Sequence, residues 1–138
     1  RCNRLHQQMS LCIMDLDHFK RINDEHGHDA GDAVLRHVAQ QLSCSLRHSD
    51  VVGRFGGEEF VLVLPDTGLE QAMAVLNRLR EDLVAAPVPV KGQLLPVSAT
   101  FGVTEVREGD AELEDVLKRA DRALYEGKGA GRNRVMTA

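Results

Sequence analysis

Residues 54–60 read Arg54-Phe55-Gly56-Gly57-Glu58-Glu59-Phe60, and they lie between two apolar runs, at residues 51–52 and 60–64. A Gly-Gly pair between apolar runs predicts a β-hairpin, because both central positions of the favoured two-residue turns need backbone angles that glycine reaches easily. Such a hairpin places the two adjacent glutamates at its tip. An ordinary solvated turn is the alternative interpretation, since Gly-Gly turns are common.

The predicted tip has open space at its two glycines next to the negative charge of its two glutamates. Because they have no side chains, the glycines let a bulky anion approach the backbone closely. Glutamates at the same place would repel a phosphate group unless a cation lay between them. The stretch therefore suggests a phosphate site that is bridged by a metal ion.

The composition of the chain limits the classes of protein to consider. At 138 residues it fits one domain with a single core, and a net charge of −4 argues against nucleic acid as a partner without excluding a local phosphate site. Cys2, Cys12 and Cys44 are odd in number and lack metal-site spacing, which favours a reduced, cytoplasmic compartment. No apolar run approaches the ~20 residues that span a bilayer, so the anchor of a membrane-attached parent protein would lie outside this chain.

The hydrophobic pattern predicts a mixture of strands and helices. Residues 9–14 are almost continuously apolar, as in a strand that is buried on both faces. The further elements expected are a helix at 18–25, a helix at 33–46, the central hairpin, a helix from the capping-box pattern Thr67-Gly68-Leu69-Glu70 to Pro87, strands at 88–90 and 94–106, a helix capped by Asp110, and a strand at 134–136. Strands joined by hairpins in this order imply an α+β fold with a largely antiparallel sheet.

Residues 54–60 resemble the signature of the GGDEF domains, the diguanylate cyclases, in the form that carries Glu in the third position. Further motif matches extend the resemblance over residues 9–136. It implies a ferredoxin-like core related to the nucleotidyl cyclases, with a mostly antiparallel sheet of about five strands surrounded by helices. Family members usually begin further upstream, so residues 1–138 are expected to be a GGDEF catalytic domain that is truncated at its N-terminus and belongs to a larger sensor protein.

Acidic residues at two places are the expected metal ligands. Alternation along the first strand puts Asp15 and Asp17 on one face, so at most two side chains of Asp15-Leu16-Asp17 share a site. The resemblance implies that Asp15, Glu58 and the backbone carbonyl of Leu16 bind Mg²⁺ or Mn²⁺. Glu58 is the first candidate for ligand and acid/base, while Glu59 qualifies only if the turn breaks the alternation. Solvated strand ends are the alternative.

The resemblance also assigns residues to the base of a GTP substrate. Asn23, His28 and Asp32 match the positions that recognise guanine, and Phe19 belongs to the same substrate-binding segment. A carboxylate accepts hydrogen bonds from the guanine edge, while an amide both donates and accepts them. Helix capping is the alternative role for Asn23 and Asp32, and His28 is otherwise a loop residue.

A second group of residues is implied to contact the phosphates. Lys20 matches a lysine near the reacting centre, where a fixed cation offsets charge on the transferring phosphoryl group. Lys128 and Arg132 match a late Lys-x-x-Gly-Arg-Asn segment that grips the triphosphate, with Gly56 and Gly57 giving room. The alternative for the late segment is a basic helix end favoured by the helix dipole.

One further motif suggests regulation. Arg47-His48-Ser49-Asp50 has the Arg-x-x-Asp form, with five residues between Asp50 and Gly56, as in the inhibitory site that binds the product cyclic di-GMP in the family. Arginine makes bidentate contacts to guanine or phosphate, and the aspartate accepts from guanine. Arg78 is a weaker secondary contact. A surface ion pair between Arg47 and Asp50 is the alternative.

Taken together, these matches predict an Mg²⁺-dependent diguanylate cyclase that condenses two GTP into cyclic di-GMP and releases two pyrophosphates. One domain binds one GTP, so a homodimer is expected for catalysis, under the control of an N-terminal sensory domain. The chain alone is expected to be largely monomeric and slow. The rival is a non-catalytic module that binds GTP or cyclic di-GMP; a GTPase is disfavoured because the chain has no Walker loop.

Overall fold

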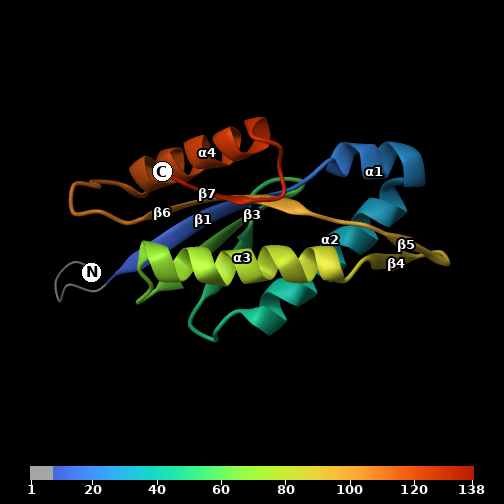
Figure 1. The fold of residues 1–138 in the computed structure, drawn as a ribbon, viewed down its shortest axis with the longest axis horizontal. Coiled ribbons are helices and arrows are strands. Elements are labelled where there is room, and N and C mark those ends of the chain that lie inside the picture. The colour runs from blue at the N-terminus through green and yellow to red at the C-terminus, as the bar shows by residue number, and fades with distance from the viewer. Residues whose placement is uncertain (1–7) are drawn as a thin grey trace.

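A computed structural model describes residues 8–138 of the chain. Its elements, in chain order, are β1 (Met9–Leu16), α1 (Phe19–His26), α2 (His28–Ser45), β2 (Val51–Arg54), β3 (Glu59–Pro65), α3 (Leu69–Ala85), β4 (Val88–Val90), β5 (Gln93–Leu95), β6 (Ala99–Glu105), α4 (Leu113–Gly129) and β7 (Val135–Thr137). Five strands form one sheet in the order β2-β3-β1-β6-β7, and β4 pairs with β5 in a separate small sheet (Figure 1).

The large sheet is mostly antiparallel, as the sequence predicts. β1 lies at its centre and runs antiparallel to both β3 and β6, and β2 runs antiparallel to β3. β7 alone pairs in parallel, with β6. Within residues 8–138, no helix has the length and apolar character that a membrane crossing requires.

Burial of β1 on both faces confirms the prediction from its continuous apolar run. Leu11 and Ile13 pack on one face with residues of α4, whereas Cys12 and Met14 belong to the core on the other face, with residues of α2 and α3. Figure 1 shows the same layers, with α4 on one side of the sheet and α2 and α3 on the other. Complete burial makes Cys12 an apolar core residue, and it raises the pKa of the thiol.

The predicted strand at 94–106 is wrong as one element. It is divided into β5 and β6, which belong to different sheets, by residues 96–98. Pro96 has no backbone N–H to donate to a strand ladder, so a break here costs no hydrogen bond at that residue. The carbonyl of Ser98 then accepts from the N–H of Asp17 at 2.9 Å, which joins the start of β6 to the end of β1.

Both predicted helix caps are also wrong, because a tertiary contact replaces the cap of α3 and a different local capping box replaces that of α4. The hydroxyl of Thr67 donates to the carbonyl of Pro65, and the first amide of α3, that of Leu69, donates to the Glu105 carboxylate at 2.9 Å. α4 begins at Leu113 with a capping box formed by Glu112 and Asp115. Asp110 instead pairs with Arg119 of α4, at 2.6 Å between Oδ1 and Nη1.

α2 begins five residues before the predicted start at 33, so the segment after α1 is helical.

The central hairpin forms as predicted from β2 and β3, but its turn is longer. The amide of Phe55 donates to the carbonyl of Glu59 at 2.8 Å, so residues 55–58 form the tip. Gly56 and Gly57 do not have positive φ; the glycines that do, within residues 8–138, are Gly27, Gly92 and Gly131. The two tip glycines therefore leave space at the turn and are not needed for its backbone angles.

Candidate functional site

Four segments meet around one hollow at the end of β1. These are the end of β1, the start of α1, the tip of the β2–β3 hairpin, and the end of α4 with the loop after it. The hollow has a volume of about 520 Å³ and is lined by Asp15, Leu16, Asp17, His18, Phe19, Lys20, Arg21, Asp24, Glu25, Glu58, Lys128 and Arg132. The expected metal ligands and the expected phosphate-binding cations therefore lie around the same space.

Strand register brings the acids together. Asp15 lies directly opposite Glu59 in the antiparallel pair of β1 and β3, so their side chains share a face of the sheet. Glu58 precedes the first residue of β3, and its carbonyl accepts from the amide of Leu16 at 3.3 Å. Strand alternation therefore does not apply to Glu58, which lines the hollow beside Asp15.

Glu59, next to this group of acids, has a raised pKa. Partial burial raises its pKa, and the negative charge of Asp15 raises it further, against the opposing effect of Lys128. Glu59 does not line the hollow, but its place opposite Asp15 in the pairing of β1 and β3 puts it close to the site.

Asp15 offers one carboxylate oxygen that nothing in the described chain satisfies. The residue is 5% exposed, its Oδ2 forms an ion pair with Lys128, and its Oδ1 is buried without a hydrogen-bond partner. Gln41 Oε1 is the one other side-chain atom of this kind among residues 8–138. An unpartnered anionic oxygen beside a second carboxylate fits a hard cation that prefers oxygen ligands.

Residues 8–138 hold no cluster of three or more His, Cys, Asp or Glu arranged to bind a metal ion. Asp15, Glu58 and the Leu16 carbonyl thus offer a partial set of oxygen ligands. Such a set suits Mg²⁺, which usually keeps several waters and takes further oxygens from substrate phosphates. The tip beside these acids is open: a Cβ on Gly57 would meet nothing within 4 Å, and one on Gly56 would meet only Glu59 Oε1, at 3.9 Å.

The residues expected at guanine lie on α1 and α2, and none of them lines the hollow. Asn23 and Asp32 lie inside these helices, whose N-caps are His18 and Gly27, so the alternative role of helix capping is wrong. His28 is the exposed first residue of α2, and therefore not a loop residue.

Close packing of α1 on α2 holds the Asn23 side chain. A Cβ on Gly31 would collide with Asn23 Oδ1, so only glycine permits this approach.

Phe19 borders the hollow but is 8% exposed and belongs to the core, where it supports the start of α1. Lys20 is exposed and pairs with Asp24 at 3.1 Å.

Four residues near the hollow were not singled out as site residues from the sequence: Ser98, Thr100, Asn133, and Asp17 in its role as their common acceptor. The Asp17 carboxylate accepts hydrogen bonds from all three. An acid directly after a buried strand is a sequence signal for Asp17. Its partners lie 81 to 116 residues away in the chain, so only the fold brings them together.

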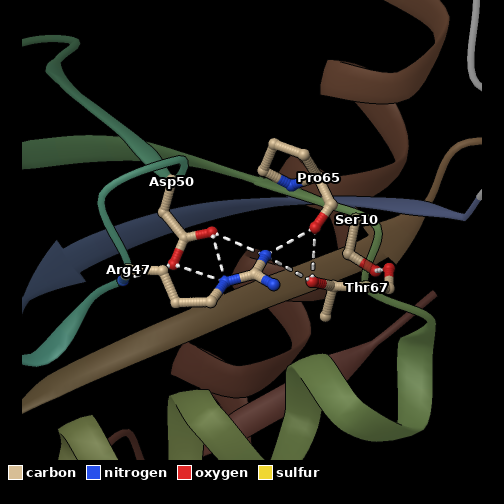
Figure 2. A network of polar contacts seen from close by, with 5 residues as sticks. All are labelled: Ser10, Arg47, Asp50, Pro65 and Thr67. Carbon is tan, nitrogen blue, oxygen red and sulfur yellow. Dashed lines mark hydrogen bonds and ion pairs between the residues drawn. The ribbon is translucent and has the colours of Figure 1, made fainter.

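The predicted inhibitory motif forms a network that extends beyond the Arg-x-x-Asp segment (Figure 2). Arg47 Nη2 donates to Asp50 Oδ1 at 2.9 Å, to the Pro65 carbonyl at 2.5 Å and to Thr67 Oγ1 at 3.0 Å. The hydrogen bond to Asp50 raises the pKa of Arg47. The Asp50 side chain is only 3% exposed, so this is more than a solvated surface pair. Arg78 is exposed on α3, and no hydrogen bond or ion pair in the described part of the chain joins it to this network.

Comparison with a family model decides the family. Residues 1–134 match the model described as "Diguanylate cyclase, GGDEF domain". The chain belongs to the GGDEF domain family.

Curated relatives of this GGDEF domain are much longer than the chain itself. It is 48% identical over 128 residues to "Diguanylate cyclase DgcP" of Pseudomonas aeruginosa, covering 93% of the chain and 19% of that protein. It is 40% identical over 137 residues to "Probable diguanylate cyclase DgcC" of Escherichia coli K12, covering 99% of the chain and 37% of that protein. The chain thus spans between about a fifth and somewhat more than a third of the length of these relatives.

Solved structures share the fold closely. Diguanylate cyclase SiaD from Pseudomonas aeruginosa, in complex with its activator SiaC, superposes with a TM-score of 0.94 at 42% identity, over 100% of this chain and 53% of that one. The active GGEEF domain of a diguanylate cyclase from Vibrio cholerae gives a TM-score of 0.91 at 36% identity, over 99% of this chain and 86% of that one. The five-stranded mixed sheet with its helices is therefore the GGDEF fold, as the resemblance implied.

Proposed function

We propose that this GGDEF domain, in the form with Glu58 in the third position of the motif, is a diguanylate cyclase. It would condense two GTP into cyclic di-GMP and release two pyrophosphates. The observation that carries the proposal is the convergence on one hollow of Asp15, with its unpartnered Oδ1, Glu58, and the cations Lys128 and Arg132. Relatives at 40% and 48% identity that are named diguanylate cyclases support the same reaction.

Asp15, Glu58 and the Leu16 carbonyl are the proposed ligands of Mg²⁺ or Mn²⁺. When bound, such a cation lowers the pKa of a 3′-hydroxyl and stabilises charge on the α-phosphate that is attacked. The structure fits this role through the buried, unsatisfied oxygen of Asp15. Glu58 is the first candidate to hold the proton of the hydroxyl, and Glu59, with its raised pKa, is the second.

The remaining contacts follow from where each side chain lies. Lys20, Lys128 and Arg132 border the hollow and would hold the phosphates, with Gly56 and Gly57 leaving room beside them. Lys128 pairs with Asp15 in this structure, so it would turn toward phosphate oxygens as the nucleotide binds. The guanine would lie toward Asn23, His28 and Asp32 on α1 and α2.

Catalysis in this proposal needs a homodimer, because a domain that binds one GTP must meet a second domain to join two nucleotides. Cyclic di-GMP would act as an inhibitor at Arg47 and Asp50, with Arg78 as a secondary contact. Structures of DgcB from Caulobacter crescentus in complex with cyclic di-GMP, at 28% and 29% identity, support binding of this ligand by the family. The Arg47 guanidinium would exchange its contacts to Pro65 and Thr67 for contacts to the ligand.

The relatives are multidomain, which supports a place for this domain within a longer, signal-receiving protein. We place its action in the cytoplasm, where Cys12 and Cys44 stay reduced.

The test is product formation from GTP. Three proteins are incubated at high concentration with GTP and Mg²⁺, and the products are analysed by chromatography: the wild-type chain, Glu58→Ala and Glu114→Ala. Glu114 is an exposed acid on α4, so its variant serves as the control. We expect cyclic di-GMP from wild type and control, and a loss of about 100-fold or more in Glu58→Ala. Full activity of Glu58→Ala would contradict the proposed site. A wild type that binds GTP saturably without turnover would leave two explanations, a binding module or a domain that needs an N-terminal wall or a dimer partner. The same assay on the longer parent protein separates them.

A further inference from the structure

The carboxylate of Asp17 is buried, and donors occupy both of its oxygens. Ser98 Oγ donates to Oδ2 at 2.6 Å, and Thr100 Oγ1 donates to Oδ1 at 2.6 Å. The backbone N–H of Asn133 donates to Oδ2 at 3.0 Å. Both oxygens of Asp17 are therefore engaged in hydrogen bonds within the protein, whereas Asp15, two residues earlier, keeps one oxygen without a partner. What it does is tie the end of β1 to the start of β6 and to the loop after α4.

The loop after α4 has a backbone conformation that depends on hydrogen bonds to other parts of the chain. Three successive residues have positive φ: Gly131 at 124°, Arg132 at 62° and Asn133 at 48°. Residues other than glycine adopt this conformation at a cost and keep it only where their surroundings fix it. The N–H of Arg132 is held by the Gly127 carbonyl at 3.0 Å, and that of Asn133 by Asp17 and by Thr100 Oγ1 at 3.1 Å.

This loop carries Arg132, which lines the hollow, and it follows directly on the end of α4, where Lys128 lines the same hollow. We infer that Asp17 is a positioning residue for phosphate binding: by accepting the Asn133 N–H it fixes the turn from which Arg132 reaches the nucleotide. The inference rests on the proposed function, because it concerns the same hollow. Asp17 acts through the loop, so its loss should weaken contacts to phosphate and leave contacts to the base in place.

Binding of GTP and of guanosine by the 138-residue chain separates these two effects. Asp17→Asn keeps the size of the side chain but replaces one accepting oxygen by a donating NH₂. Thr100 loses its acceptor if the NH₂ takes the place of Oδ1, and Ser98 and Asn133 lose theirs if it takes the place of Oδ2. We expect the affinity for GTP with Mg²⁺ to fall about tenfold, while the affinity for guanosine, which has no phosphate, changes less than about twofold. Faster hydrogen exchange of the Asn133 amide should accompany the change.

Two further variants keep the test decisive. Thr100→Val keeps the shape of the side chain but removes one donor to Asp17 and one acceptor of the Asn133 N–H. It should weaken GTP binding with the same selectivity even if Asp17→Asn does not fold. Thr104→Val is the matched control: it removes a buried hydroxyl of β6 that contacts Arg119 instead, at 2.9 Å, and should leave GTP affinity unchanged. Equal losses of GTP and guanosine binding in the Asp17 variant would indicate a structural role only and overturn the inference.

A double-mutant cycle with Arg132→Ala tests the route of the effect. If Asp17 acts through the loop, Asp17→Asn should cost little further GTP affinity once Arg132 is truncated. Fully additive losses would overturn the inference. A wild-type chain that binds no GTP would overturn the proposed function itself, whereas wild-type binding with an unaffected Asp17 variant would overturn only the positioning role.

Discussion

A buried carboxylate oxygen without a partner is costly, because it has lost its water and gained nothing in exchange. Asp15 Oδ1 is in this state, while Oδ2 meets Lys128. The ion pair therefore satisfies half of the carboxylate, and the proposed Mg²⁺ would satisfy the other half. At the scale of single residues, the site is marked by an unsatisfied group next to Glu58 and Glu59.

Glu59 gives this site a measurable pH dependence. Its raised pKa means that the native state keeps the Glu59 proton to a higher pH than the unfolded chain does, so stability falls as pH rises above the ordinary Glu value. Replacing the charge, as in Glu59→Gln, should raise the melting temperature at pH 7 by roughly 1–3 °C, a small effect because the side chain is partly exposed.

Thermal unfolding at pH 7 and near pH 4 checks this prediction. The difference between Glu59→Gln and wild type should shrink at the lower pH, where a larger fraction of Glu59 is protonated in both states. Glu114→Gln, an exposed acid on α4, is the control and should show little change at either pH. A Glu59→Gln variant that is less stable than wild type at pH 7 would contradict the assignment.

At the scale of elements, the packing of α4 on β6 decides where the end of α4 lies, and hence where Lys128 is presented. Gly102 in the middle of β6 is the point of closest approach: a Cβ there would collide with the backbone of Ala120 and Leu124. Gly127 at the end of α4 makes a similar approach, since a Cβ on it would come within 2.7 Å of Thr100 Cγ2. Glycine at these positions lets the helix lie directly on the sheet.

Gly102→Ala should therefore destabilise the fold by about 3 kcal/mol or more, because the colliding atoms are backbone and cannot rotate away. Urea unfolding measures the loss. Gly53→Ala on the edge strand β2 is the matched control: its Cβ would meet nothing within 4 Å, so its stability should change by less than about 0.5 kcal/mol. Equal effects of the two substitutions would contradict this account of the packing.

At the scale of the whole molecule, the hollow is formed by elements from both halves of the chain, yet it offers one set of phosphate-binding cations. In the proposed reaction, two GTP molecules would require two copies of the domain. Turnover per protomer should rise with protein concentration, by about tenfold over a hundredfold dilution series in the range where dimers form. Steady-state product formation across that series is the measurement, and turnover independent of concentration would contradict the need for a dimer.

Local patterns in the sequence predict several elements and the class of site. The apolar run of residues 9–14 identifies β1, because a strand buried on both faces needs apolar side chains on both. The glycines between two apolar runs identify the β2–β3 hairpin. The glycines beside Glu58 favour a bridged phosphate, and the family resemblance names Asp15 and Glu58 as the proposed metal ligands.

Tertiary structure decides what depends on partners distant in the chain. The first amide of α3, that of Leu69, is capped by Glu105, which lies 36 residues away in the chain. The Thr67 hydroxyl instead accepts a hydrogen bond from Arg47. The break between β5 and β6 follows from pairing in two different sheets. The role of Asp17 depends on Ser98, Thr100 and Asn133. The sequence determines the chemistry of each side chain. Whether a buried polar group finds hydrogen-bond partners depends on which donors the fold brings next to it.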